Sequence, residues 1–231
     1  LLVKYDHPEQ AWQEILSNYE VKAVYINHDY EPYAIQRDDA LAEFLSSENI
    51  PLFSFKDQVI FEKSEVVKAD GKPYTVFTPY YKIWLQKLDD FHVKAYPTLK
   101  YSNNFAKLSP LAIPSLSEMG FTPTTIALPA ISYQNKISAY AAKRDFPAVN
   151  GTTHIGIHLR FGTLSIREAA AMAVEKKADK WLAELAWREF YMMILWHFPH
   201  TTTKSFKEKY DAIKWDNNET YFKKWCEGKT G

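Results

Sequence analysis

An alternation of helical and strand-like segments over the first quarter of the chain constrains the fold more than any other feature. Residues 8–19 carry apolar side chains at helical spacing, and the β-branched run 21–26 that follows suits a buried parallel strand. The pattern then repeats, with helical spacing over 38–46 and strand-like runs over 51–55 and 59–61. This alternation predicts part of a doubly wound α/β sheet, without the opening strands that a complete sheet of this kind needs.

The sequence pattern changes twice in the remainder of the chain. Residues 63–125 are interrupted by proline and glycine and hold one helical stretch, near 80–88. The run 76–81 is too aromatic for free coil, so we interpret this region as a long ordered linker. Farther on, Ser165 to Glu168 has the form of a capping box, and Asp179 could cap a helix over residues 180–197.

We therefore expect an α/β plus all-α fold in three parts. A partial, Rossmann-like α/β domain spans residues 1–62, a linker spans 63–125, and a partial helical domain spans 126–231. The overall net charge is zero, but the first part holds 4 basic and 12 acidic residues, a net charge of −8. The other two parts have net charges of +3 (8 basic, 5 acidic) and +5 (16 basic, 11 acidic). The basic excess permits a phosphate-backbone partner without demanding one.

Composition narrows the class of protein. The chain is 46% hydrophobic and 24% charged, which indicates a globular protein. Its 7 Trp, 15 Tyr and 14 Phe residues favour either a densely packed core or surfaces that stack on bases or planar cofactors. No apolar run approaches the roughly 20 residues of a membrane span.

Targeting features are absent from the sequence itself. The chain starts without a methionine, and Leu1–Lys4 does not resemble a signal peptide but reads as the middle of a domain. The single cysteine, Cys226, excludes an internal disulfide framework and fits a reducing cytosol. We expect a cytoplasmic protein.

The segment 144–154 contains the most informative loop. Gly151 is followed by Thr152 and Thr153 just before a helical pattern. Glycine would let a phosphate approach the backbone, and the two hydroxyls would donate hydrogen bonds to it. The alternative is a plain loop with a threonine N-cap. The segment fits neither a Walker loop nor a Rossmann fingerprint.

Charged residues also lie within an otherwise apolar helix over 181–191. On a helix, Glu184, Trp187, Arg188 and Tyr191 share one face. One interpretation is a surface salt bridge between Glu184 and Arg188, which contributes a few tenths of a kcal/mol. The other is a face that lines a cavity, because charges among so many apolar residues more often meet a ligand.

The sequence gives little indication of a metal site or of a catalytic cysteine. The histidines at 154, 158, 197 and 200 have no carboxylate or cysteine companions at the spacing of known zinc motifs, so we expect no metal. Cys226 has no nearby histidine to activate it as a nucleophile.

Several motifs carry a family resemblance in their order and spacing. They are Asn27–Ala34, Arg37–Asp38, Phe77–Tyr80, Asp145–Pro147, Gly151–Thr153, Leu159–Glu168, Glu184–Tyr191 and Trp225–Gly231. Together they resemble the DNA photolyase and cryptochrome family of blue-light flavoproteins, and within it the bacterial cyclobutane pyrimidine dimer photolyases. The similarity runs nearly from end to end.

The resemblance implies a fold and a reaction. In this family an α/β domain holds an antenna chromophore, and a helical domain holds FAD. Light drives an electron from reduced flavin into a pyrimidine dimer that is flipped out of DNA, and the dimer splits. The resemblance thus implies a deoxyribodipyrimidine photo-lyase that acts on damaged DNA as a monomer and away from membranes.

The resemblance also assigns roles to single residues. It places the flavin phosphates and ribose against Tyr140, Thr152, Thr153, His154 and Ile155, and the flavin pocket against Trp181 and Arg188. Glu184 would hydrogen-bond the damaged bases, and Trp187 would stack on them or wall their cavity. Trp215 would be the outermost tryptophan of the chain that re-reduces the flavin.

The sequence departs from the family pattern at named positions and in length. Gly156 replaces a serine of many members, and Tyr33 and Ala34 replace polar residues that hold a folate antenna in some, which leaves the antenna chromophore open. The first strands and most of the second half of the helical domain are missing, so we expect the fragment itself to be inactive. Two alternatives stay open: a cryptochrome-type photoreceptor, and a non-catalytic nucleic-acid-binding fragment.

Overall fold

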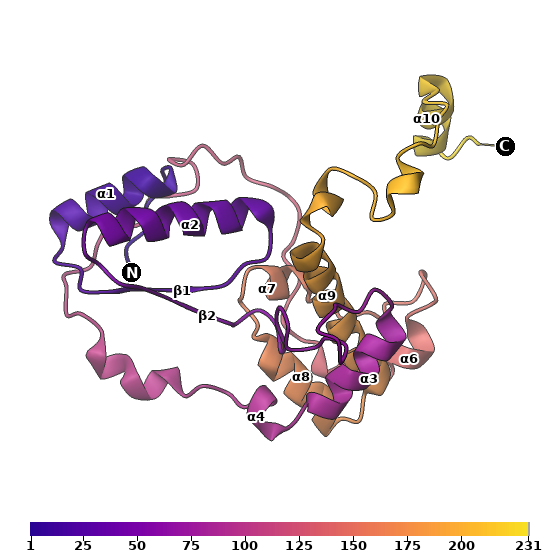
Figure 1. Cartoon of the computed structure of the whole chain (residues 1–231), viewed down its shortest axis with the longest axis horizontal. Helices are drawn as coiled ribbons and strands as arrows, with labels where there is room; N and C mark the ends of the chain where they lie inside the picture. The colour runs from indigo at the N-terminus through magenta and orange to yellow at the C-terminus, as the bar shows by residue number, and fades with distance from the viewer. Residues whose placement is uncertain (231) are drawn as a thin grey trace. The chain divides into compact units, whose positions relative to one another are not determined.

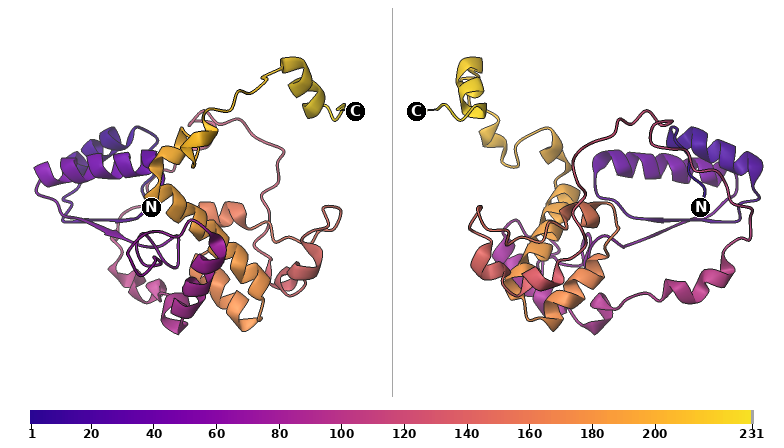
Figure 2. Two further views of the ribbon diagram at one scale, coloured as in Figure 1. Left: turned by 45° about the vertical axis from the view of Figure 1, so that its right-hand side comes forward. Right: turned by 180° about the vertical axis from the view of Figure 1, so that it is seen from behind.

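The computed structural model describes residues 1–230 and divides the chain into two compact units. The first is Leu1–His197, and the second begins at Phe198. Figures 1 and 2 show the course of the chain through both. The division of the sequence at residues 62 and 125 remains a prediction.

The first unit opens with the expected alternation of helix and strand. Its elements are α1 (Pro8–Asn18), β1 (Val24–Asn27), α2 (Pro32–Ser47) and β2 (Leu52–Phe55). The strands pair in parallel, with Val24 opposite Leu52 and Asn27 opposite Phe55. Both helices lie on the same side of the strands in Figures 1 and 2, and Val24, Leu41 and Leu45 form the buried contact between the two layers.

Two expectations for this region were wrong in detail. The helix α2 begins at Pro32 and not near residue 38, because proline at the first helical position provides a suitable start. Residues 59–61 are not a strand. They are buried, but the Ile60 N–H donates to a carboxylate oxygen of Glu189 (2.7 Å) instead of to a neighbouring strand.

The predicted linker contains more helix than expected. It holds α3 (Phe77–Lys87), α4 (Asp90–Val93) and the 3₁₀ helix η1 (Thr98–Asn104). Tyr80 and Trp84 of α3 are almost completely buried, and α3 packs against α9. The α3 part of the predicted linker therefore belongs to the core of the first unit.

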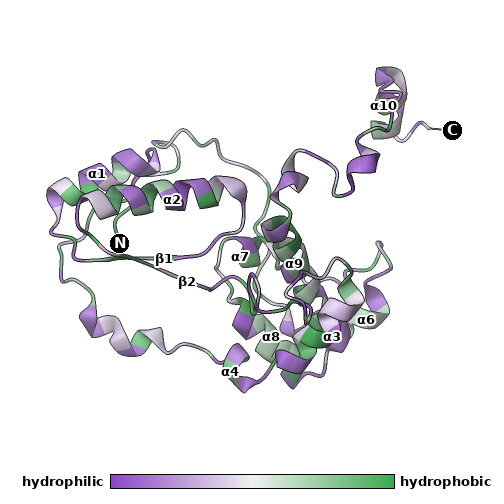
Figure 3. Cartoon of the chain, in the orientation of Figure 1, coloured by the Kyte–Doolittle hydropathy of each residue, from purple (hydrophilic) through white to green (hydrophobic). Residues whose placement is uncertain are grey.

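Short helices lead into two longer ones in the rest of the first unit. They are α5 (Gln134–Ile137), α6 (Tyr140–Lys143), α7 (Gly156–Arg160), α8 (Ile166–Glu175) and α9 (Asp179–His197). The Ser165 side chain caps α8 as predicted, accepting from the Arg167 N–H at 3.2 Å. Helices α8 and α9 pack together, and Figure 3 shows hydrophobic stretches on α3 and α9, which share this core.

The second unit is helical as well. It contains the 3₁₀ helices η2 (Pro199–Thr202) and η3 (Glu208–Tyr210) and the helix α10 (Glu219–Cys226). The Asn218 side chain caps α10 by accepting from the Tyr221 N–H at 3.1 Å. The predicted fold class, α/β plus all-α with a small parallel sheet, is confirmed. None of the helices described up to residue 230 has the length and apolar character that crossing a membrane requires.

Candidate functional site

All seven residues that the resemblance assigns to the flavin line one cavity. Its volume is about 290 Å³, and its lining is Tyr140, Thr152, Thr153, His154, Ile155, Gly156, Leu159, Trp181, Glu184, Leu185 and Arg188. The loop between α6 and α7 supplies the two threonines and His154, and α9 supplies Trp181, Glu184 and Arg188. Segments far apart in the sequence thus meet at a single site.

Hydrogen bonds and backbone geometry shape this loop. The Lys136 ammonium donates to Asn150 Oδ1 (2.7 Å) and to the Thr152 carbonyl (2.9 Å). His154 has a left-handed backbone with φ of 56°, which is uncommon for a residue other than glycine and occurs often at functional sites. The lysine therefore holds a strained turn in place at the wall of the cavity.

Gly151 of the loop and Gly156 at the start of α7 have different surroundings. A Cβ on Gly151 would overlap the side chain and backbone of Lys143, so this glycine permits close packing of the chain on itself. The expectation that Gly151 lets a phosphate approach the backbone stays a prediction. A Cβ on Gly156 would meet no atom within 4 Å, so the backbone is open at Gly156.

The chemistry of the cavity fits a nucleotide. Two threonine hydroxyls, the His154 imidazole, the Tyr140 phenol and the Arg188 guanidinium can donate hydrogen bonds to phosphate or ribose oxygens. Trp181 is only 3% exposed, and its ring stacks on Tyr133 at a centroid distance of 5.5 Å. The donors therefore suit the sugar and phosphate part of a flavin nucleotide, against a rigid aromatic wall.

The ion pair of Glu184 differs from the one that helical spacing suggests. Glu184 pairs with the guanidinium of Arg144, which lies 40 residues earlier and also lies over the Tyr140 ring. Arg188 instead donates to the carbonyl oxygens of Gln58 (2.7 Å) and Leu159 (3.3 Å). The interpretation as a Glu184–Arg188 surface salt bridge is therefore wrong.

The residues of α9 that were predicted to share one face lie in two different environments. Glu184 and Arg188 line the cavity, whereas Trp187 lies outside it. The Trp187 ring stacks almost parallel on Phe77 of α3 (3.6 Å, 10°) and on Tyr191 (5.4 Å, 23°). Trp187 thus belongs to an aromatic stack between two helices.

Glu189 is a buried residue of α9 that sequence reasoning missed. It is 2% exposed and is the one buried carboxylate in the part of the chain that the structure describes. It accepts hydrogen bonds from the Ile60 N–H (2.7 Å), Tyr80 Oη (3.0 Å) and Trp84 Nε1 (2.6 Å). Burial raises the pKa of Glu189 to about 7, although these hydrogen bonds act in the opposite direction.

Trp215 lies in the second unit. Its side chain is 73% exposed, as its polar neighbours in the sequence predicted.

Two of the histidines considered as metal ligands bind protein groups instead. The ring nitrogens of His158 lie 2.8 Å from Thr163 Oγ1 and 2.6 Å from the Pro129 carbonyl. His197 Nε2 lies 3.0 Å from the Lys63 carbonyl. Within residues 1–230, no group of three or more histidine, cysteine or acidic side chains could hold a metal ion.

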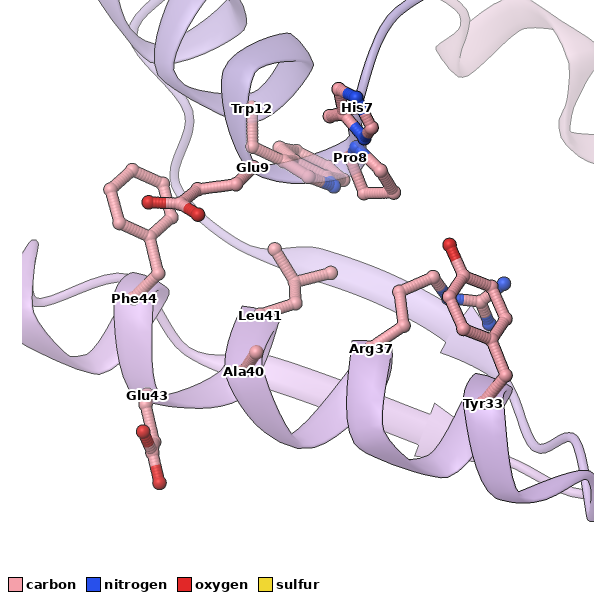
Figure 4. Close-up of a pocket in the computed structure, with 10 residues that line it drawn as sticks. All are labelled: His7, Pro8, Glu9, Trp12, Tyr33, Arg37, Ala40, Leu41, Glu43 and Phe44. Atoms are coloured by element: carbon pink, nitrogen blue, oxygen red, sulfur yellow. The ribbon is translucent and has the colours of Figure 1, made fainter.

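A second cavity, of about 470 Å³, lies between α1 and α2 (Figure 4). Figure 4 shows Trp12 and Leu41 facing each other across it, with Tyr33 beside Arg37 at one end. The sequence departure at Tyr33 thus lies at a cavity with aromatic and aliphatic walls, apart from the residues assigned to the flavin.

Comparison with known proteins identifies the family. The family described as DNA photolyase matches residues 1–100, and the one described as FAD binding domain of DNA photolyase matches residues 181–231. This chain belongs to the DNA photolyase family.

Curated relatives are similar to this chain over nearly its whole length. A deoxyribodipyrimidine photo-lyase of Alkalihalophilus pseudofirmus is 30% identical over 96% of this chain and 50% of its own length. One from Synechococcus is 29% identical over 100% of this chain and 53% of its own length. The chain therefore spans about half the length of the photolyase relatives that it matches.

Solved structures share the fold. A bacterial class III photolyase from Agrobacterium tumefaciens superposes with a TM-score of 0.80 at 26% identity, covering 96% of this chain and 51% of that one. A cryptochrome from Synechocystis superposes with a TM-score of 0.72 at 15% identity, covering 97% and 52%. The presence of part of a photolyase FAD-binding domain agrees with the donors found in the cavity.

We expect residues 1–231 alone to bind FAD weakly. The cavity of about 290 Å³ is at the lower limit for ligand pockets, which usually enclose most of a drug-sized molecule, and FAD is larger. Gel filtration of the chain after incubation with FAD, with the flavin absorbance of the protein peak as the readout, measures this. A stoichiometric flavin signal in the protein peak would contradict the expectation.

Proposed function

We propose that a protein of full family length containing this chain carries out light-driven, FAD-dependent repair of cyclobutane pyrimidine dimers in DNA. The observation that carries the proposal is the meeting of seven flavin-assigned residues and Glu184 at one cavity. The similarity to deoxyribodipyrimidine photo-lyases along the whole chain supports the same reaction. FAD, when bound, supplies the light absorption and the electron for dimer splitting.

In this proposal the loop and α9 bind the cofactor. Thr152, Thr153 and His154 donate hydrogen bonds to the sugar and phosphate oxygens of FAD. Tyr140 lines the same cavity and donates its hydroxyl to the same part of the cofactor. Arg188 holds α9 against residues 58 and 159 through its two carbonyl contacts, so its guanidinium is fixed where it lines the cavity. These fixed donors orient the cofactor before light is absorbed.

Glu184 recognises the lesion in the same proposal. Its carboxylate lines the cavity and is held by Arg144. The donor groups of flipped bases would replace this arginine as hydrogen-bond partners, because a carboxylate accepts several bonds at once. Trp187 is stacked between Phe77 and Tyr191, which favours its role as a wall of the lesion cavity over direct stacking on the bases.

We expect Glu184→Ala to weaken the binding of damaged DNA by about 1–3 kcal/mol, because the flipped bases lose a buried acceptor. Affinity for undamaged DNA should barely change, since phosphate contacts set it. Titrations of the parent and of Glu184→Ala with a dimer-containing oligonucleotide and with its undamaged counterpart measure both affinities. Equal losses on both DNAs would assign Glu184 a purely structural role with Arg144.

A further inference from the structure

A serine, a histidine and a glutamate lie in line beside the small sheet. His28 Nδ1 is 2.8 Å from Glu62 Oε2, and His28 Nε2 is 3.0 Å from Ser54 Oγ. Hydroxyl, imidazole and carboxylate thus follow one another in the order that activates serine in hydrolases of unrelated folds. None of the three lines the flavin cavity.

The strand register brings these residues together. β1 and β2 pair so that Ile26 lies opposite Ser54. His28 follows Ile26 by two residues and therefore projects from the same face. The His28 N–H donates to the Phe55 carbonyl at 2.8 Å, which extends the pairing by one residue and fixes the imidazole beside the serine.

A buried tyrosine orients the carboxylate. Tyr30, 1% exposed, donates its hydroxyl to Glu62 Oε2 at 2.7 Å. Burial raises the pKa of Glu62, but the hydrogen bonds from Tyr30 and His28 outweigh it and hold the pKa below its usual range. An ionised Glu62 accepts from Nδ1–H, so Nε2 of the neutral ring is left as an acceptor for the Ser54 hydroxyl.

The serine opens onto a cavity. Ser54 is exposed, and the cavity has a volume of about 210 Å³ and is lined by Ile26, His28, Asp29, Ile35, Asp38, Asp39, Ala42, Leu52, Ser54, Lys63 and Trp196. The Lys63 ammonium lies 5.0 Å from the Trp196 ring centroid and brings a positive charge to the cavity. The apolar side chains of the cavity offer room for a small acyl group.

We propose that Ser54, His28 and Glu62 form a nucleophilic site that hydrolyses small carboxylic esters. The three aspartates at the cavity disfavour anionic substrates, so the esters are uncharged or cationic. This activity uses no flavin and no DNA and is independent of the repair function proposed above.

Each step of the reaction uses groups that the site contains, together with water. Ser54 Oγ attacks the ester carbonyl carbon while its proton moves to His28 Nε2. The bond between the carbonyl carbon and the ester oxygen then breaks, and the proton on Nε2 goes to the departing alkoxide. Water attacks the acylated serine with His28 again taking the proton, and the acid and the free serine result.

Labelling with diisopropyl fluorophosphate tests the proposal on the chain of 231 residues. Serine attack on phosphorus displaces fluoride and adds one diisopropylphosphoryl group, which intact mass and peptide mapping locate. We expect the label on Ser54, none on this peptide in Ser54→Ala, and labelling about 100-fold slower in His28→Ala and Glu62→Gln. Ser47→Ala is the matched control, because Ser47 is exposed but donates only to the Phe44 carbonyl.

Two results would overturn the proposal. One is the absence of label on Ser54 in the parent chain; the other is labelling of Ser54 at the parent rate in both His28→Ala and Glu62→Gln. Circular dichroism and the unfolding midpoint show whether each variant is folded. Glu62→Gln tests activation of the serine separately if His28→Ala does not fold.

Discussion

Glu189→Ala will lower the free energy of unfolding by about 3–5 kcal/mol, because three buried donors lose their acceptor and a cavity is left behind. The donors belong to Ile60, Tyr80 and Trp84, which are 105 to 129 residues away in the sequence. Denaturant unfolding of parent and variant at equal pH measures the difference. Glu175→Ala is the control, since the exposed Glu175 of α8 makes only a contact with Lys176, and its loss should change the unfolding free energy by less than about 0.5 kcal/mol.

The pH dependence of stability provides a second test of Glu189. Its pKa is raised to about 7 from an ordinary value near 4.5, so between these values the folded chain holds a proton that the unfolded chain releases. The stability contributed by this group is therefore present at low pH and lost as pH rises through about 7, by roughly 3 kcal/mol in all. Glu189→Gln cannot ionise, so the stability of the parent relative to this variant should fall between pH 4.5 and 7.5. A constant difference would contradict the raised pKa.

In a protein of full family length, Trp215→Phe will slow severely or abolish the light-driven reduction of oxidised FAD. Trp215 is 73% exposed, so water can stabilise the cation that remains when it gives up an electron. Phenylalanine is much harder to oxidise, so it would interrupt the electron relay that the family resemblance assigns to this position. Absorbance of oxidised flavin during blue illumination with an external reductant follows the reaction.

The controls for Trp215 separate a relay from a packing role. Trp225→Phe changes another exposed tryptophan of the second unit, 68% exposed, and should leave photoreduction unchanged. Dimer repair that starts from chemically reduced flavin should stay near normal in Trp215→Phe, because its electron comes directly from the flavin. Photoreduction at the parent rate in Trp215→Phe would show that Trp215 has a packing role only.

Local patterns in the sequence were sufficient for much of the fold. The helices α1 and α9 and the strand β2 follow their apolar spacing to within a residue or two, because their apolar side chains pack against the hydrophobic clusters of the first unit. Residues 59–61 were mistaken for a strand, since a short buried run looks the same whether its backbone donates to another strand or to a side chain. The Glu189 carboxylate, 129 residues away from Ile60, decides that question here.

The sequence predicted those site residues that belong to family motifs. It did not predict the contacts that form between residues far apart in the sequence. All seven residues that the resemblance assigned to the flavin are among those that line the cavity of about 290 Å³. The pairing of Glu184 with Arg144 across 40 residues could not be read from helical spacing, which suggested Arg188 instead. A glutamate within an apolar helix was the available signal for Glu189, whereas the contact of His28 with Ser54 depends on strand register.

Dimer splitting under blue light tests the proposed repair most directly. A protein of full family length that contains this chain is loaded with FAD, reduced, and mixed with an oligonucleotide that carries one thymine dimer. We expect the dimer to disappear under blue light and to persist in the dark, with splitting reduced in Glu184→Ala. A protein that holds reduced flavin, absorbs the light and leaves the dimer intact would contradict the repair function and favour a photoreceptor.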